Sequence, residues 1–418
     1  MNWGLPLSET NGGVTPASVR GLKATIFSLF FFAPTISAIS PAMAALSQAY
    51  PEITPAGIGY VLTIAAAFQA ITALVTGAIA GRVVSYRTLL VASSILYVAG
   101  GCFPFFLADG QGFTALLVSR AVFGIGTGIM MPLSNALIMA CFDDSETRTG
   151  LVGAGNVALN AGTVVTNLLG GYLCVISWQM TFTLHILGSV VLVFSLLFLR
   201  GSVVPEVDES GEGQSVARAF AKSIVKLPAA AFGFPALLLL TLVITQPIIV
   251  YNAQLLAEAG IGTSVTAGYM TIAFAAGGIA ASSLFKKIVG RLGAWLVPLA
   301  FLVAVLATAL GFFGASHENG NIVMYALAVF LDGASLLLVT CFVPVAVAER
   351  IDSGLIAPAM GLVSFATAAG TFLAAPFAQV SAVIIPSGEI RAVLLCASFV
   401  ALAAMLVSAF VLVRKRRK

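Results

Sequence analysis

Long apolar runs separated by short polar stretches form the main pattern along this chain. Each run is about as long as the roughly 20 residues that a helix needs to cross a bilayer. The runs fall at 22–48, 55–80, 88–107, 113–140, 151–176 and 180–199, and then at 228–256, 265–284, 294–314, 322–347, 360–380 and 390–413. The pattern predicts an all-α membrane protein with twelve transmembrane helices.

The longest polar stretch, residues 200–227, separates two sets of six runs and is typical of a linker. We therefore expect an N-terminal six-helix bundle over 1–199, a cytoplasmic linker over 200–227, and a C-terminal six-helix bundle with a basic cytoplasmic tail over 228–418. Residues 1–19 lack the basic region and cleavage site of a secretory signal, so we expect the first run to be a true span.

The composition supports a membrane location. Of the 418 residues, 60% are hydrophobic and only 9% are charged, whereas a soluble domain carries about 25% charged residues. The excess apolar surface must therefore face lipid. The five cysteines have neither metal-ligand nor disulfide spacing, and we expect no metal and no cofactor.

The placement of positive charge predicts the orientation. If the N-terminus is cytoplasmic, all but two of the 20 Lys and Arg residues fall on the cytoplasmic side, as the positive-inside rule requires. We therefore expect a multi-pass protein of the cell membrane with both termini in the cytoplasm. The net charge of +4 then reflects loops that face anionic lipid, so nucleic acid is not an expected partner.

Two charged residues lie well inside predicted spans, where charge is costly and usually functional. Arg120 lies twelve residues before Pro132, and Asp332 lies twelve residues before Pro344. These matched spacings indicate an internal repeat, so the two six-helix bundles are expected to be pseudo-symmetric.

Each of the two charges has a structural and a functional interpretation. Asp332 is either a protonated carboxyl held in the bundle or a group that gains and loses the coupling proton. In the structural interpretation Arg120 ties helices together through backbone carbonyls; a role in proton handling is implied only by the family resemblance given below. A pairing of Arg120 with Asp332 across the centre is a further hypothesis.

Polar side chains form stripes on several predicted helices. Asn156, Asn160, Thr163 and Asn167 share one face of the fifth helix, where they either join helices or line a wet cavity. We favour a cavity and expect these residues to bind substrate. The other expected substrate-binding residues lie on the first, seventh and eleventh spans and are Thr35, Gln246, Tyr251, Asn252, Thr367 and Thr371.

The motifs of enzymes and of ATP-driven pumps are not found. The sequence contains no phosphate-binding loop, no metalloprotease helix motif and no Ser/His/Asp set. His185 has no companion ligand and is expected to be a packing residue. We therefore do not expect an enzyme.

Several motifs resemble those of the major facilitator superfamily. The segment Gly77 to Arg87 is similar to the first cytoplasmic loop motif of that family, and Arg120 with Gly124, Gly126 and Gly128 is similar to the fourth-helix motif of its bacterial drug and metabolite proton antiporters. The resemblance implies that helices 1, 4, 7 and 10 line a central cavity and that the two halves rock around it. The expected gating residues are Gly77, Arg82, Arg87, Gly124, Gly128, Pro132 and Pro344.

The function that these features predict is secondary active transport. We expect proton-coupled export of a small organic molecule by alternating access, carried out by a functional monomer with protons and lipid as its other partners. An uptake symporter or a uniporter, in which Arg120 clamps a substrate carboxylate, remains open, and so does a non-transporting receptor or scaffold. The substrate cannot be read from the sequence.

Overall fold

The computed structural model describes residues 16–32, 35–80, 84–142, 145–199, 230–348, 356–386 and 389–416, apart from the side chains of some helical residues. The described part contains 12 helical segments long and apolar enough to span a membrane, and it contains no β-strand. Both predictions, twelve spans and an all-helical fold, are confirmed. The predicted linker lies outside the described residues.

The N-terminal half is built from six spans, four of which are interrupted. Its elements are α1 (Pro16–Phe32), η1 (Thr35–Ala42), α2 (Met43–Ala49), α3 (Pro55–Ile58), α4 (Tyr60–Ile79), α5 (Tyr86–Cys102), η2 (Phe103–Phe106), α6 (Phe113–Cys141), α7 (Ser145–Ile176), α8 (Trp178–Phe182), η3 (Thr183–Gly188) and α9 (Ser189–Phe198).

The C-terminal half repeats this plan with longer continuous helices. Its elements are α11 (Ala230–Val250), α12 (Asn252–Glu258), α13 (Ser264–Leu292), η4 (Gly293–Trp295), α14 (Leu296–Gly314), α15 (Ile322–Ala348), α16 (Ile356–Ile384) and α17 (Ala392–Arg416).

Several of the predicted single helices are interrupted in the structure, and two of the breaks bear on the contact between the halves. The predicted span 55–80 divides at Gly59 into α3 and α4, and the predicted span 228–256 divides at Tyr251 into α11 and α12. Pro247 lies one turn before the second break, where the missing N–H weakens the helix. Both breaks lie where the two halves meet, as described next.

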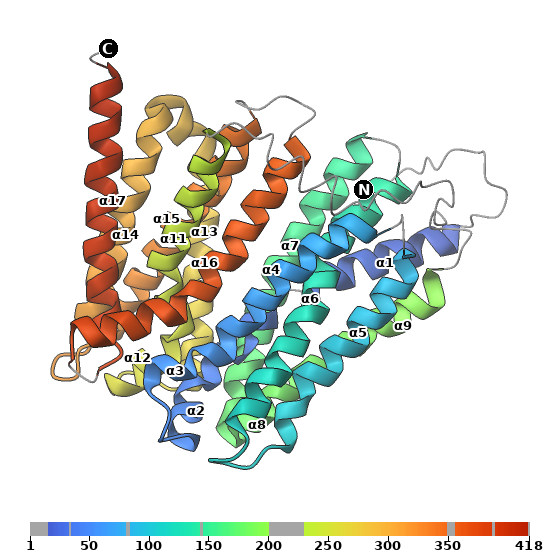
Figure 1. The fold of residues 1–418 in the computed structure, drawn as a ribbon, viewed down its shortest axis with the longest axis horizontal. Coiled ribbons are helices and arrows are strands. Elements are labelled where there is room, and N and C mark those ends of the chain that lie inside the picture. The colour runs from blue at the N-terminus through green and yellow to red at the C-terminus, as the bar shows by residue number, and fades with distance from the viewer. Residues whose placement is uncertain are drawn as a thin grey trace.

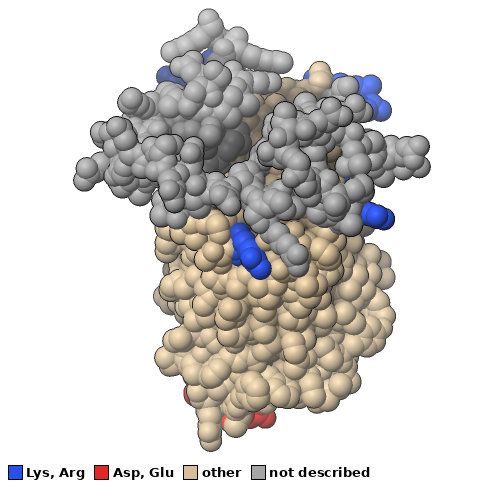
Figure 2. Space-filling model, turned by 90° about the vertical axis from the view of Figure 1, so that its right-hand side faces the viewer, with Lys and Arg blue, Asp and Glu red and all other residues tan. Residues whose placement is uncertain are grey.

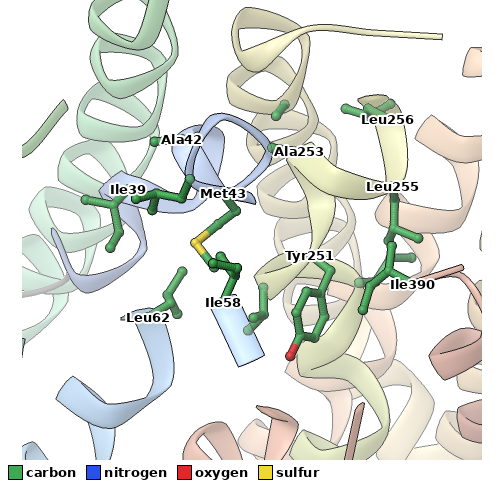
Figure 3. Packing of buried hydrophobic residues seen from close by; sticks show 14 of the residues in the cluster. Ile39, Ala42, Met43, Ile58, Leu62, Tyr251, Ala253, Leu255, Leu256 and Ile390 are labelled. Carbon is green, nitrogen blue, oxygen red and sulfur yellow. The ribbon is translucent and has the colours of Figure 1, made fainter. Parts of the chain in front are cut away.

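The short helices α2, α3, α8 and α12 gather at one end of the molecule, which we call the closed end (Figure 1). The start of α1 and the end of α17 lie toward the opposite end (Figure 1). One large cluster of buried apolar residues at the closed end draws on both halves, from Ile39 and Met43 to Tyr251, Leu255 and Ile390 (Figure 3). The halves are therefore joined there by a continuous hydrophobic core.

Away from the closed end, each half has its own core. One further cluster contains only residues between Val19 and Leu199. Two others contain only residues between Leu238 and Ala401. Because the described core packing is shared at one end and separate elsewhere, the molecule consists of two bundles that meet mainly at the closed end.

The outer surface fits a bilayer. On the face that Figure 2 shows, Lys and Arg lie toward one end, Asp and Glu lie at the opposite end, and other residues fill the space between them (Figure 2). Large apolar side chains on α17, such as Phe399, Leu406 and Phe410, are 63%, 58% and 66% exposed. Such a surface is stable only against lipid.

Candidate functional site

Arg120, on α6, is fully buried within the N-terminal half. Its Nε donates a hydrogen bond of 3.1 Å to the carbonyl of Val61 on α4. Its Nη1 lies 3.4 Å from Nε2 of His185 on η3, and the guanidinium carbon lies 4.2 Å from the centre of the Phe123 ring. The arginine thus connects α4, α6 and η3, which corresponds to the helix-tying interpretation of this residue.

His185 supports Arg120 and is not a lone packing residue. Its ring lies 4.6 Å from the Phe123 ring and 6.2 Å from the Phe182 ring, measured between centres. Its Nδ1 lies 2.9 Å from the carbonyl oxygen of Phe182. If Nδ1 carries the proton and donates to that oxygen, Nε2 can accept a hydrogen bond from Arg120. Sequence reasoning found the packing of His185 but missed its polar role.

Asp332, on α15, is fully buried within the C-terminal half. Neither carboxyl oxygen has a hydrogen-bond partner in the described part of the chain. Of the helices packed against α15, α11, α14 and α16 carry no charged, histidine, cysteine or tyrosine residue, and α13 carries Tyr269 and, near its far end, Lys286, Lys287 and Arg291. No ion pair of Asp332 is found among the described residues. The carboxyl group therefore lies in an apolar interior without a counter-charge.

The hypothesis that Arg120 and Asp332 pair across the centre does not describe this conformation. The Arg120 side chain is bonded within its own half, and the Asp332 oxygens contact no hydrogen-bond donor among the described residues. The two residues occupy equivalent positions before Pro132 and Pro344, but each points into its own bundle.

The polar stripe on α7 separates into two parts. Toward the closed end, Asn167 is buried and donates hydrogen bonds to Ser37 Oγ at 3.1 Å and to the Thr163 carbonyl at 2.9 Å. The Thr163 hydroxyl donates to the Leu159 carbonyl. Asn160, two turns earlier on the helix and farther from the closed end, is exposed. The side chain of Asn156 lies outside the described residues.

The seventh-span candidates also take different positions. Tyr251 and Asn252 are buried at the closed end, where the Tyr251 hydroxyl donates to the Ala56 carbonyl across the two halves at 3.0 Å. Gln246, one turn earlier, is only half-buried. Tyr251 is thus part of the contact between the halves.

The hydroxyl candidates on α16 remain accessible. Thr367 is exposed and Thr371 is half-buried. Their hydroxyl groups donate to the carbonyls of Val363 and Thr367 in the preceding turn. The oxygen of each hydroxyl is left able to accept a hydrogen bond. The side chain of Thr35 lies outside the described residues.

The gating candidates are mainly packing and bending positions. A Cβ atom on Gly124 would lie 2.3 Å from the Ala65 carbonyl oxygen, and one on Gly128 would lie 2.7 Å from the Gln69 carbonyl oxygen. Close approach of α6 to α4 therefore requires glycine. Arg87 donates to the Leu196 carbonyl at 3.2 Å.

The remaining gating candidates are only partly described. Pro132 and Pro344 lie inside α6 and α15. Arg82 and the surroundings of Gly77 fall outside the described residues.

A contact region at the closed end was not predicted from the sequence. Several of its cross-half hydrogen bonds run from Ser40 to the Ile249 carbonyl at 2.7 Å, from Tyr60 to Gln379 at 3.1 Å, and from Gln254 to Ser47 and the Pro55 carbonyl. Gly59 makes room for the Tyr251 ring, since a Cβ atom there would lie 2.1 Å from the Tyr251 hydroxyl. We call Tyr251, Gly59 and these hydrogen-bonded residues the gate.

Outside the spans, a small polar cluster lies at the end of α12. Glu258, His317, Glu389 and Arg391 border a cavity of about 320 Å³. Partial burial, with a smaller contribution from the negative charge of Glu389, raises the pKa of Glu258. Glu258 also accepts a hydrogen bond of 3.1 Å from the Ile390 N–H, which acts in the opposite direction. No cluster of potential metal ligands occurs among the described residues.

Comparison of the whole sequence with protein families gives one clear match. The family model described as Major Facilitator Superfamily matches residues 25–375, which is most of the chain. The chain is also 28% identical over 142 residues to a protein of Bacillus subtilis (strain 168) named methylenomycin A resistance protein. That match covers 34% of this chain and 28% of the relative, so it spans little more than a quarter of the relative's length.

Several solved structures of transporters resemble this fold. The crystal structure of a mutant of the nucleoside transporter NupG superposes with a TM-score of 0.75 at 13% identity and covers 93% of this chain and 98% of that chain. A POT family transporter in complex with 5-aminolevulinic acid gives 0.73 at 14% identity, with 94% and 96% covered. A bacterial homolog of the human lysosomal transporter Spinster gives 0.67 at 16% identity, with 96% of each chain covered.

At such identities the structures establish the fold alone, while the family match extends over most of the chain. Together with the twelve spans, the match confirms the expected fold, the expected resemblance and the expectation that the protein is not an enzyme. The chain belongs to the Major Facilitator Superfamily and is a multi-pass membrane transporter of small molecules.

Proposed function

We propose that this protein exports a small organic molecule in exchange for protons, by alternating access of a central site to the two sides of the membrane. The single observation that carries the proposal is the distribution of core packing. The two halves share a hydrophobic core at the closed end and have separate cores elsewhere. Two bundles joined mainly at one end can rock about a central site.

The charge distribution gives the proposal an orientation. Lys and Arg lie toward the end opposite the gate, as far as Figure 2 shows, and cytoplasmic segments carry an excess of these residues. We propose that the closed end faces outward and that the conformation described is inward-facing, with both termini in the cytoplasm.

Asp332 is the proposed proton-binding residue. An ionised carboxylate that is buried without a hydrogen bond or a counter-charge is very costly, and the Asp332 oxygens have neither in the described residues. We therefore propose that Asp332 carries a proton in this conformation and releases it when water reaches it in the cycle.

The accessible polar residues are the proposed substrate contacts. Asn160 and Thr367 are exposed, and Gln246 and Thr371 are half-buried, while Asn167, Tyr251 and Asn252 are taken up by the packing at the closed end. We propose that the first group, on α7, α11 and α16, offers amide and hydroxyl groups to the substrate. A relative that carries the name of a resistance protein supports export over uptake.

Proton-coupled exchange in proteoliposomes tests this function. A substrate is first found by thermal-shift screening, because a ligand that binds the folded state raises its stability. When a proton gradient is imposed, the purified protein should then move that substrate in the direction opposite to the downhill flow of protons. The Asp332→Asn variant should retain exchange of labelled for unlabelled substrate but lose the response to the gradient.

The matched control is Glu318→Gln, which neutralises an exposed carboxyl group at the closed end and should behave as the wild type. Full proton-driven transport by Asp332→Asn would refute the coupling role. Movement of substrate and protons in the same direction would show an uptake symporter. Exchange without any proton movement in the wild type would show a uniporter.

A further inference from the structure

We propose that Tyr325 and Asn252 are positioning residues through which the protonation of Asp332 controls the gate. This inference rests on the proposed function, in which Asp332 binds the coupling proton. It assigns a path within the C-terminal half from that carboxyl group to the contacts between the halves.

The first part of the path lies along α15. Tyr325 and Asp332 are seven residues apart on this helix, so they lie two turns apart on one face. Both side chains are fully buried. The Asp332 side chain leans toward the start of the helix, as helical side chains do, and therefore toward the turn that carries Tyr325. Gly314 on α14 holds this turn closely, since a Cβ atom there would lie 2.8 Å from the Tyr325 nitrogen.

The second part of the path joins α15 to α12. The Tyr325 hydroxyl donates a hydrogen bond of 3.2 Å to Oδ1 of Asn252, the first residue of α12. The Asn252 Nδ2 donates a bond of 2.9 Å to the Ala267 carbonyl on α13. Both bonds are buried, where hydrogen bonds act more strongly than in water. Asn252 thus fixes the start of α12 to the rest of the C-terminal half.

The third part of the path is the gate itself. Tyr251 directly precedes Asn252 and donates to the Ala56 carbonyl. Gln254, two residues after Asn252, donates to Ser47 and to the Pro55 carbonyl. One short helix therefore carries the internal connection to α15 together with cross-half contacts. A change in the position of Asn252 must shift the gate contacts on either side of it.

No other titratable group on the described elements around Asp332 competes for this role. The helices α11, α14 and α16 have none. On α13, the Tyr269 hydroxyl lies 2.7 Å from that of Tyr172, and Lys286, Lys287 and Arg291 lie near its far end. On α12, Glu258 is bound to the Ile390 N–H. The remaining titratable groups of α15 are Tyr325 itself and Cys341.

The direction in which pH should shift the gate follows from the burial of this path. A negative charge on Asp332 would act on the Tyr325–Asn252 hydrogen bond in a medium of low dielectric constant, where charges interact strongly. In the conformation with the closed gate, the Asp332 oxygens have no hydrogen-bond partner among the described residues. Such surroundings favour the protonated carboxyl group over the carboxylate. Loss of that proton is therefore expected to weaken the connection and favour opening of the closed end.

The test measures opening of the closed end against pH. Spin labels at positions 52 and 318, both exposed and on opposite halves, report the distance across the closed end in nanodiscs. In the wild type, the ratio of open to closed molecules should rise at least about fivefold between acidic and alkaline pH, the lower bound of common coupling strengths. Asp332→Asn should show no dependence on pH.

The deciding variant is Tyr325→Phe, which should fold and melt nearly as the wild type but lose most of the pH dependence. Asn252→Ala should behave in the same way and serves if Tyr325→Phe does not fold. The control is Tyr97→Phe, which removes a buried hydroxyl that donates to the Phe32 carbonyl in the N-terminal half at 3.1 Å. It should keep the response of the wild type.

Two results would overturn the inference in different ways. A wild-type pH response in folded Tyr325→Phe and Asn252→Ala, with Asp332→Asn unresponsive, would refute the path and leave the role of Asp332 intact. A wild-type response in Asp332→Asn would refute the proposed role of Asp332 and the path with it.

Discussion

Replacement of Tyr251 by phenylalanine removes a single hydrogen bond between the two halves at the gate. The Tyr251 hydroxyl donates to the Ala56 carbonyl at 3.0 Å, and the ring occupies the space that Gly59 leaves open. Phenylalanine keeps the ring and its packing. The variant therefore isolates the contribution of the hydroxyl to closure.

The size of the effect follows from the net value of a neutral hydrogen bond. Such a bond contributes about 0.5–1.5 kcal/mol, so its loss should raise the ratio of open to closed molecules about two- to tenfold. The carbonyl of Ala56 is reached by water once the closed end opens. Loss of the hydrogen bond therefore destabilises the closed state relative to the open state, and opening is favoured.

A native cysteine provides the assay. Cys174 on α7 is 9% exposed and belongs to the shared core at the closed end. It lies three residues after Gly171, whose carbonyl accepts a hydrogen bond of 3.2 Å from Ser264 of the other half. With the other four cysteines replaced by serine, alkylation of Cys174 by a maleimide requires separation of the halves. When opening is fast compared with alkylation, the rate is proportional to the open fraction, so it should rise about two- to tenfold in the variant.

The matched control is Tyr50→Phe. The Tyr50 hydroxyl also donates to a carbonyl at the closed end, that of Gln111 at 2.9 Å, but within one half. Its loss should leave the alkylation rate of Cys174 unchanged. Equal rates in Tyr251→Phe and the parent protein, or equal acceleration in both variants, would refute the assignment of Tyr251 to the gate.

Three further predictions concern stability and the two charged groups. Gly277→Ala should lower thermal stability by about 1–3 kcal/mol through overpacking, because the new Cβ atom would clash with the Phe330 carbonyl oxygen. The control Gly290→Ala should leave stability unchanged, since a Cβ atom there would have nothing within 4 Å. Equal melting temperatures of the two variants would contradict the packing of Gly277. Arg120→Met should lower stability by about 1.5–3 kcal/mol through lost charged hydrogen bonds, with an unchanged ratio of protons to substrate in proteoliposomes; an altered ratio would show a role in proton handling. Since the pKa of Glu258 is raised in the folded protein, the contribution of this group to stability is greatest at acidic pH and is lost as the pH rises through that pKa. The melting temperature of Glu258→Gln should therefore fall less than that of the wild type over this range. Identical melting profiles would contradict a raised pKa of Glu258.

The fold could be predicted from the sequence because the patterns that indicate it are local. Twelve apolar runs predict twelve spans without knowledge of which helices touch. The matched spacing of Arg120 to Pro132 and of Asp332 to Pro344 indicated two related halves. The break at Gly59 was missed, because an apolar run continues through it. The break at Tyr251 comes one turn after Pro247, which is visible in the sequence, but its place at the contact between the halves was not predicted.

The candidate site was harder to predict from the sequence, because it depends on which neighbouring helix each helix face contacts. Arg120 shares its face with Gly124 and Gly128 at intervals of four residues, and these glycines are the positions at which α6 packs on α4. That spacing could have shown that Arg120 points into its own bundle. Nothing local in the sequence distinguishes the packed Asn167 from the exposed Asn160.

Opposite movement of the two ends is the most direct test of alternating access in this protein. One pair of spin labels at positions 52 and 318 spans the closed end, and another at 135 and 345, exposed residues just beyond Pro132 and Pro344, spans the two halves toward the other end. When a substrate found by thermal shift is added across the pH range, the first distance should increase as the second decreases. Distances that change together, or a closed end that never opens, would contradict the account.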